Sequence, residues 1–525
     1  MRKKIYKWHR ALSLIISIPV ILWASSGLMH PIMTNIRPRI ATQFHPSPGI
    51  DSTQLQVKLQ DCLVRNKIDS ISTVHVVQMG GQQFYQVIMD ETGADIRYFS
   101  TKTGSLLNNG DELYARFLGK YFLEGTDKKE AATQMHEVEY TEPVAMSDHD
   151  CCMMATVSIM NSKGARITGV SRLDHFNEEY KYINRLLPVY KISFDRSDGI
   201  RIYVETASGR FGFAVDNKRS AFDTFFGFCH TWEWMNGLGK TKYFLMVAIT
   251  LTGFLTTLFG LYIFFTTRTR KADNAIVKAR RRHRYTSLTA SLFTLMFTFS
   301  GGFHALDKVL PKEHLIDRLH QRFAVSEIHP DFNRLKQLAG DRDIQDISVC
   351  RINGKTYWQV YLKKQKDGAD GRKDLMKTMS VAMPDIIYTE ADTYAILPKG
   401  DEQYARFLAT AFSRQKESNA QSAVPITKFT DEYGFVNKRL PVWKVGYASN
   451  GNERYYIETS SGVLSTRIED KDLAEGYSFS FLHKHHFMDW GGKTVRDIST
   501  MFWAAMQLAM VTIGLILYFR FVRKR

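Results

Sequence analysis

Residues 11–29 read ALSLIISIPVILWASSGLM, a run that contains no Asp, Glu, Lys or Arg. Three further runs share this property, at residues 243–265, 285–303 and 498–519. Each is long enough to cross a hydrocarbon core of about 30 Å as a helix that rises about 1.5 Å per residue. A buried helix of a soluble protein normally carries a polar stripe, which these runs lack. The sequence therefore predicts four transmembrane helices.

Basic residues gather in three short segments beside these runs, at residues 1–10, 266–284 and 520–525. Together the segments hold 17 Lys and Arg residues and one acid, Asp273, so they carry +16 of the formal net charge of +17. Lys and Arg in short segments beside spans mark the cytoplasmic side. We therefore expect both termini inside and two large domains outside. Because the charge is explained by topology, it does not indicate a nucleic-acid partner.

The chain repeats itself along its length. His9-Arg10, Ser26-Gly27 and His30 return 274 positions later as His283-Arg284, Ser300-Gly301 and His304. GDELYARFL at 110–118 returns as GDEQYARFL at 400–408, YVET at 203–206 returns as YIET at 456–459, and His230 returns as His483. The first run could also be a signal peptide, but the same segment recurs in mid-chain, where no signal peptide could sit. We predict two copies of one unit, each a membrane helix, an outer domain and a second membrane helix.

The outer domains combine strand and helix patterns. Alternating residues at 201–204, followed by Ser208-Gly209, predict a half-buried strand that enters a turn. Residues 110–118 predict a helix with Asp111 as its N-cap, and we attribute the recurrence of this segment to packing. The predicted fold class is therefore membrane α-helical, with four transmembrane helices and two α+β extracytoplasmic domains. The predicted segments are 1–30 (cytoplasmic tail and first helix), 31–242 (first outer domain), 243–265 (second helix), 266–284 (basic loop), 285–304 (third helix), 305–497 (second outer domain) and 498–525 (last helix and tail).

Six of the 16 histidines stand at the ends of the predicted helices in three equivalent pairs, His9 with His283, His30 with His304, and His230 with His483. Two imidazoles that face each other across a helix bundle provide the axial ligands of a b-type haem. Gly27, Gly301 and Gly302 leave room for a flat ring, or simply allow helices to pack closely. A single histidine at a membrane interface is better explained as solvated, but three matched pairs favour haem. The sequence leaves open whether an outer haem uses His30 and His304, His230 and His483, or one of each.

A second group of candidate ligands lies in a segment without a counterpart in the second half, and comprises His149, Cys151, Cys152 and Met153. Such soft ligands suit copper(I). Met and Cys are also ordinary core residues, so packing is the alternative explanation.

These motifs resemble the PepSY-associated transmembrane family, through the His-Arg and Ser-Gly pairs, the Tyr-x-Glu-Thr-x-Ser-Gly elements and the histidine before the second helix of each half. Some members of that family are haem-containing inner-membrane reductases for ferric siderophores. The resemblance implies PepSY-like outer domains and two haem b groups. It also implies that the haem ligands are, in the first place, His9, His283, His230 and His483. His30 and His304 are less clearly part of the family pattern. The chain departs from that pattern at Tyr394, where a turn glycine is expected, which predicts that this turn is lost.

The resemblance also implies a direction for electron flow, from a cytoplasmic donor or a membrane quinol to a ferric siderophore or similar chelate outside a bacterial inner membrane. Reduction of Fe(III) to Fe(II) weakens binding by hard oxygen ligands, so that the metal can be released. The sequence has no Gly-x-Gly-x-x-Gly loop for a dinucleotide, which favours an external donor. The alternative is a non-enzymatic sensor or binding protein in the membrane, whose periplasmic domains hold a peptide, a protease or a chelate.

Overall fold

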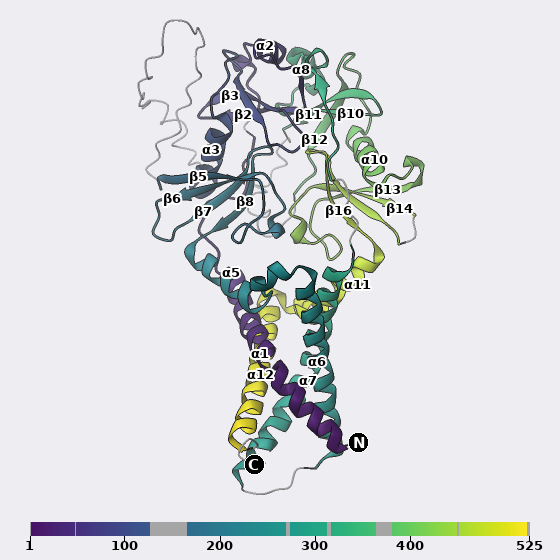
Figure 1. Cartoon of the computed structure of the whole chain (residues 1–525). Coiled ribbons are helices and arrows are strands. Elements are labelled where there is room, and N and C mark those ends of the chain that lie inside the picture. Colours follow the sequence, from purple (N-terminus) through teal and green to yellow (C-terminus); the bar gives the residue numbers. More distant parts are fainter. Residues whose placement is uncertain are drawn as a thin grey trace. The chain divides into compact units, whose positions relative to one another are not determined.

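A computed structural model describes residues 2–47, 49–125, 165–268, 274–311, 317–363, 381–448 and 451–521. The chain divides into two compact units (Figure 1). The helical unit comprises Met1–Arg37, Lys218–His314 and Asp470–Arg525, and the sheet unit comprises Pro38–Asn217 and Leu315–Glu469. Residues 218–242 and 470–497, which hydropathy placed in the outer domains, therefore group with the long helices.

Four long helices build the helical unit, α1 (Arg2–Asn35), α6 (Lys240–Thr266), α7 (Ala275–Val309) and α12 (Gly492–Phe521). They include the four predicted runs. Helix α1 contacts α6 and α12, and α7 contacts the same two helices, so the four form a closed bundle. Among the described residues, three helical segments are long and apolar enough to cross a membrane, Arg2–Asn35, Lys240–Thr266 and His486–Arg520. The chain is thus compatible with a multi-pass membrane protein.

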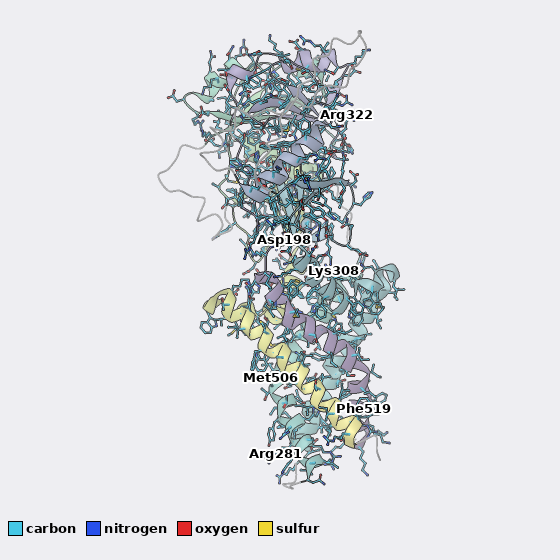
Figure 2. All side chains as sticks on the ribbon, turned by 90° about the vertical axis from the view of Figure 1, so that its left-hand side faces the viewer. Asp198, Arg281, Lys308, Arg322, Met506 and Phe519 are labelled. Carbon is cyan, nitrogen blue, oxygen red and sulfur yellow. The ribbon has the colours of Figure 1, made fainter. Side chains whose placement is uncertain are left out.

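Helix α7 differs from the other three by its many hydroxyl groups, which lower its hydropathy. Five of these hydroxyls donate hydrogen bonds to carbonyls three or four residues earlier in the helix, those of Thr289, Ser291, Thr294, Thr298 and Ser300. A hydroxyl that bonds to its own helix does not need water. Figure 2 shows that α7 runs from Arg281, at the end where α12 finishes with Phe519, to Lys308 at the opposite end of the helical unit.

Small residues bring α6 and α7 close together. A Cβ added at Gly302 would lie 2.7 Å from Thr250 Oγ1, and one added at Gly253 would lie 3.2 Å from Thr298 Cγ2. A larger side chain at either position would push the helices apart. At Gly302, close helix packing is therefore the better explanation than room for a flat ring.

Each half of the sheet unit contains a three-stranded antiparallel sheet, a helix and a four-stranded antiparallel sheet. The first half has α2 (Leu59–Arg65), β2 (Thr73–Met79), β3 (Gln82–Ile88), β4 (Ile96–Ser100), α3 (Gly110–Glu124), β5 (Ile167–Leu173), β6 (Val189–Phe194), β7 (Arg201–Glu205) and β8 (Arg210–Val215). The second half has α8 (Phe332–Ala339), β10 (Ile344–Ile352), β11 (Lys355–Leu362), β12 (Asp385–Glu390), α10 (Gly400–Ser413), β13 (Ala420–Ile426), β14 (Val442–Tyr447), β15 (Arg454–Glu458) and β16 (Val463–Ile468). These sheets and helices are compatible with the predicted α+β arrangement, and the same order of elements occurs in both halves.

One hydrophobic cluster of the sheet unit contains residues of both halves. Strand β1 (Ser70–Ile71) of the first half pairs with β9 (Phe323–Ala324) of the second. Behind this pair, Leu63 and Phe99 belong to the same buried cluster as Trp358. A polar contact also connects the two halves, because His75 Nδ1 lies 2.7 Å from Asp346 Oδ2. The halves therefore pack against each other through this cluster, while each half also has a buried cluster of its own.

The recurring Gly-Asp-Glu segment packs in the same way in both halves, but Asp111 is not the N-cap. Helix α3 begins at Gly110, after Asn109 in a left-handed conformation with φ +53°. Asp111 instead accepts a hydrogen bond of 3.0 Å from the Tyr98 hydroxyl. A Cβ at Gly110 would lie 2.8 Å from the Tyr98 ring, which explains the glycine. The second half repeats this arrangement with Lys399, Gly400, Asp401 and Tyr388.

The predicted loss of the turn at Tyr394 is wrong. The turn is present, because the Glu390 amide donates to the Ala395 carbonyl at 2.9 Å. Tyr394 adopts φ +61°, a conformation that an L-residue takes only when its surroundings hold it there. Its hydroxyl accepts the Asp331 amide at 2.7 Å, and the Arg334 guanidinium lies 5.2 Å from the ring centroid. These contacts stabilise the turn without a glycine.

A buried carboxylate links the halves of the sheet unit by ion pairs. Glu458 of β15 lies 2.5 Å from Arg439 Nη1 and 2.6 Å from Arg210 Nη1 of the first half. Burial by itself raises the pKa of Glu458, but the two arginines outweigh it and lower the pKa to about 2. The ionised form is therefore the one that the fold stabilises.

Acid should weaken the sheet unit through Glu458. A carboxyl group whose pKa is lower in the folded than in the unfolded protein stabilises the fold at pH values above its unfolded pKa, which is about 4.3 for Glu. This contribution to the free energy of unfolding falls by roughly 2 kcal/mol between pH 7 and pH 3. Glu458→Gln should be less stable than wild type at pH 7, because Arg439 loses its buried partner, and should lose less stability on acidification. The measurement is the thermal unfolding midpoint of the full chain in detergent at pH 7 and pH 3. Glu205→Gln, at the equivalent position, is the control, and parallel pH curves for wild type and Glu458→Gln would contradict the role of Glu458.

Candidate functional site

Two histidine rings meet in the helical unit. The centroids of His230 and His483 lie 6.0 Å apart, with an angle of 84° between the rings. Each ring stacks on a phenylalanine, Phe226 at 4.5 Å and Phe479 at 4.7 Å. We call His230 and His483 the central pair. The structure thus brings together one of the three histidine pairs that the sequence singled out.

His30 and His304 flank the central pair but do not contact it directly. The His30 ring lies 5.2 Å from Phe226, and the His304 ring lies 4.4 Å from Phe479. His304 Nδ1 also contacts Glu475 Oε1 at 2.5 Å. Each flanking histidine is therefore separated from the central pair by a phenylalanine. The continuous line of rings is His30, Phe226, His230, His483, Phe479 and His304.

The chain reaches the central pair in the same way in both halves. His230 follows α5 (Asn217–Cys229), and His483 ends a single π-helical turn after α11 (Asp470–Ser478). Two residues later the backbone turns sharply, because Trp232 has φ +50° and His485 has φ +56°. Short 3₁₀ helices, Glu233–Leu238 and His486–Gly491, then lead into α6 and α12. This turn directs both histidines back against the bundle.

Serines of the repeated Ser-Gly pairs hold the central pair in place. Ser26 Oγ of α1 lies 2.9 Å from His230 Nδ1, and Ser300 Oγ of α7 lies 3.2 Å from His483 Nδ1. Each hydroxyl donates its single hydrogen to a carbonyl of its own helix, at 2.8 Å for Ser26 and 2.7 Å for Ser300. The hydroxyl must then accept from the imidazole Nδ1–H. Nε2 is left with a free lone pair, which is the form of histidine that binds a metal.

Burial keeps the central pair neutral. Burial, together with the nearby charge of His30, lowers the pKa of His230 to about 4. Burial, followed by the repulsion that a protonated His230 would exert, lowers the pKa of His483 well below its usual value. Near pH 7 both imidazoles are therefore unprotonated at one nitrogen, as metal ligands must be.

Flat aromatic rings line both sides of the central pair. In the first half, Trp23 Nε1 donates to the His230 carbonyl at 3.0 Å, and the Trp23 ring stacks on Trp232 at 5.1 Å. In the second half, Phe297 meets the edge of the His483 ring at 5.4 Å and stacks on His485 at 5.2 Å. The surroundings of the imidazoles are thus apolar and planar, as a porphyrin requires.

The separation of the central pair fits a metal between two imidazoles. A metal–nitrogen bond of about 2 Å, the length found at zinc sites, places the centroids of two opposed imidazoles roughly 6 Å apart. The observed 6.0 Å agrees with this value. The anchored Nδ1 atoms, the aromatic walls and this separation are compatible with His230 and His483 as the residues that would hold a haem.

His9 and His283 occupy equivalent positions near the other ends of α1 and α7. His9 Nδ1 donates to the Thr256 carbonyl at 3.0 Å. A Cβ at Gly260 would lie 3.2 Å from His9 Cε1, and one at Gly514 would lie 3.1 Å from His283 Cε1. Each histidine therefore fits against a glycine on the second helix of its own half. In the part of the chain that is described, no ring contact joins His9 to His283, so their pairing stays a prediction.

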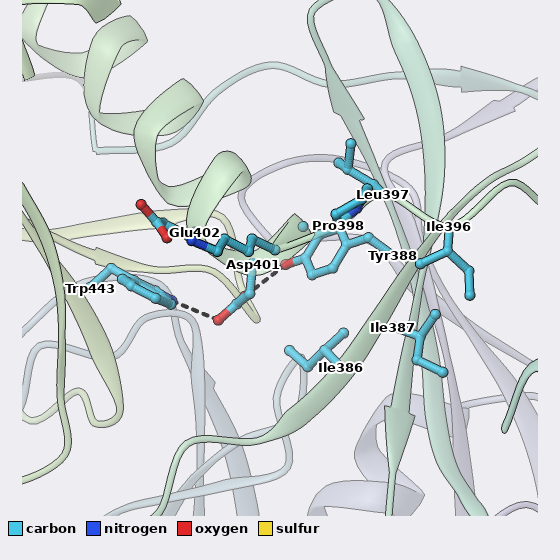
Figure 3. A pocket seen from close by; sticks show the side chains of 11 residues that line it. Ile386, Ile387, Tyr388, Ile396, Leu397, Pro398, Asp401, Glu402 and Trp443 are labelled. Carbon is cyan, nitrogen blue, oxygen red and sulfur yellow. Dashed lines mark hydrogen bonds between the residues drawn. The ribbon is translucent and has the colours of Figure 1, made fainter.

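A pocket of about 370 Å³ lies in the sheet unit (Figure 3). Its lining is mostly apolar and includes Ile386, Ile396 and Leu397. Both of its carboxylates are already engaged, because Asp401 accepts hydrogen bonds from Tyr388 at 2.8 Å and from Trp443 at 2.6 Å, and Glu402 accepts one from Arg406 at 3.0 Å. No histidine or cysteine lines the pocket. It is therefore suited to an apolar group rather than to a metal.

The described residues contain no cluster of three or more His, Cys, Asp or Glu side chains arranged to hold a metal ion. The predicted soft-metal ligands His149, Cys151, Cys152 and Met153 lie outside the described residues.

Sequence reasoning missed two kinds of residue. Ser26 and Ser300 were noted only as part of a repeated pair, although their recurrence with the histidines was the signal for a shared role. His485 was missed because the first half has Trp232 at the equivalent position, so the repeat gave no signal for it.

Comparison with known proteins adds no relative. No protein-family model matches the chain, and a search of curated proteins finds no match. The resemblance to the PepSY-associated transmembrane family therefore rests on the repeated motifs.

Proposed function

We propose that the protein is a haem-b transmembrane oxidoreductase that passes electrons to an extracytoplasmic ferric chelate such as a siderophore. The observation that carries the proposal is the central pair, whose rings lie 6.0 Å apart with both Nδ1 atoms held by serines. A bound haem would supply an iron that accepts and donates one electron. The side chains of the bundle hold the two imidazoles, fix their tautomers and exclude water.

The donor and the second haem follow from the same proposal. His9 and His283 are assigned to an inner haem, because each fits against a glycine of the partner helix in its half. Electrons are proposed to enter from a cytoplasmic donor or a membrane quinol and to leave by the central pair. His30 and His304 are assigned to the surroundings of the outer haem, since a phenylalanine separates each from the central pair.

We further propose that α7 is a fourth transmembrane helix in a bacterial inner membrane, with both termini cytoplasmic and the PepSY-like sheet unit periplasmic. Its 35 residues are more than enough to cross the hydrocarbon core. Its hydroxyls bond within the helix, so they do not prevent burial in lipid. The basic residues before and after the long helices favour this orientation.

A second function is favoured by one observation, the pocket of Figure 3. Its apolar lining could hold a side chain of a peptide, as expected for a non-enzymatic sensor or binding protein. We rank this second, because it leaves the two serine–histidine pairs of the bundle without a role.

Electron transfer to a chelate can be measured with the purified full chain. The protein is reduced with dithionite, freed of excess reductant and mixed with a ferric hydroxamate and an Fe(II) chelator. We expect the haem bands to return to the oxidised form, with one electron moved from haem iron to each Fe(III). Haem-loaded protein that stays reduced would contradict the proposed acceptor.

Replacing a ligand should remove its haem, because each substitution breaks one pair. His230→Ala and His483→Ala should lose the outer haem to a similar degree, and His9→Ala and His283→Ala the inner one. Ser26→Ala or Ser300→Ala should weaken haem affinity by roughly tenfold to hundredfold, as for other residues that orient a ligand. Haem per polypeptide is the measurement, with His175→Ala, at an exposed position of the sheet unit, as the control. Loss in one member of a pair with full retention in the other would refute that pairing.

The four-span topology is tested by cysteine labelling in cells. Asn274→Cys, just before α7, should react with a membrane-impermeant maleimide only after permeabilisation. Lys102→Cys, exposed in the sheet unit, should react in spheroplasts. The parent chain gives the background from native cysteines. Labelling of both positions in intact spheroplasts would rule out this topology.

A further inference from the structure

The two halves differ directly beside the central pair. Thr231 and Trp232 follow His230, whereas Lys484 and His485 follow His483. Trp232 and His485 share the same left-handed backbone conformation, so the difference lies in the side chains alone. The second half therefore places a cation and an imidazole where the first half has a hydroxyl and an indole.

His485 has a buried nitrogen without a partner. The residue is 0% exposed, and its Nδ1 lies 3.0 Å from Ser499 Oγ. Within the described residues, Ser499 makes no other side-chain hydrogen bond and Nε2 makes none at all. The hydroxyl hydrogen of Ser499 is thus free to donate to Nδ1, unlike those of Ser26 and Ser300. Nε2 then carries the imidazole hydrogen and is a buried donor that lacks an acceptor.

Lys484 places a positive charge in the same neighbourhood. Its Nζ lies 5.1 Å from the centroid of Phe479, the ring that stacks on His483. Its charge acts on both His30 and His483. Among the described residues Lys484 forms no ion pair, although the carboxylate of Glu475 acts on its charge. His485 is also close to His483, because the Phe297 ring contacts both histidines.

We propose that Lys484 Nζ and His485 Nε2 bind the carboxylates of the haem held by the central pair and so fix its orientation. The inference rests on the proposed function. Haem b carries two carboxylates on one edge and only apolar groups on the other. Thr231 and Trp232 offer neither a cation nor a free donor, so the acidic edge of the haem faces the second half. A charged donor pairs with a carboxylate more strongly than a neutral one does.

The test compares haem with its dimethyl ester, in which both carboxylates are neutralised. Haem-free full chain in detergent is titrated with each compound, and affinity is read from the Soret band. We expect wild type to bind the ester at least tenfold more weakly than haem. The double variant Lys484→Thr with His485→Trp, which copies the first half, should bind the two equally. Thr231→Ser should behave like wild type.

Equal affinity of wild type for haem and ester would overturn the assignment, as would discrimination that survives in the double variant. If the double variant does not fold, Lys484→Gln and His485→Phe should each reduce the discrimination, and two unchanged single variants would overturn it. If the variants lose affinity for ferric citrate but still bind haem more tightly than its dimethyl ester, Lys484 and His485 serve a carboxylate chelate and not the cofactor. Absence of any bis-imidazole spectrum in wild type would instead refute the proposed function.

Discussion

The hydrogen bond between a helix serine and the Nδ1 of a histidine is the interaction on which the site depends. It occurs twice, from α1 to His230 and from α7 to His483. Because each serine also bonds to its own helix, the hydrogen bonding favours the tautomer with hydrogen on Nδ1 and holds the ring in position. A neutral imidazole with a free lone pair can bind a metal, and the proposed haem would use one such lone pair from each half.

Duplication explains why two such histidines meet. Equivalent helices and turns of the two halves place equivalent side chains next to each other. Each half therefore contributes one serine and one histidine to the site. The sheet unit follows the same rule, since its halves share a buried cluster and are joined by a strand pair and by the buried carboxylate of Glu458. Where the halves diverge, as at Trp232 and His485, the repeat no longer explains the residue and a separate role has to be sought.

Much of the fold could be predicted from the sequence, because hydropathy and repeats are local or linear signals. The four long helices, the strand at 201–205 and the helix at 110–124 all appear where the patterns placed them. The N-cap of α3 was mispredicted because the carboxylate of Asp111 is taken by Tyr98, a contact that depends on the packed sheet. The turn at Tyr394 survives without glycine for a similar reason, since Asp331 and Arg334 hold the ring.

The candidate site was only partly predictable. The sequence identified six histidines, but it could not tell that phenylalanines separate His30 and His304 from the central pair, because that order exists only in three dimensions. The most direct test of the account is the optical and electron paramagnetic resonance spectrum of the full chain, purified in mild detergent from haem-replete cells. The account predicts a sharp Soret band that shifts on reduction, with a low-spin ferric signal from two imidazole ligands. A folded but colourless protein, or haem that is only high-spin, would contradict it.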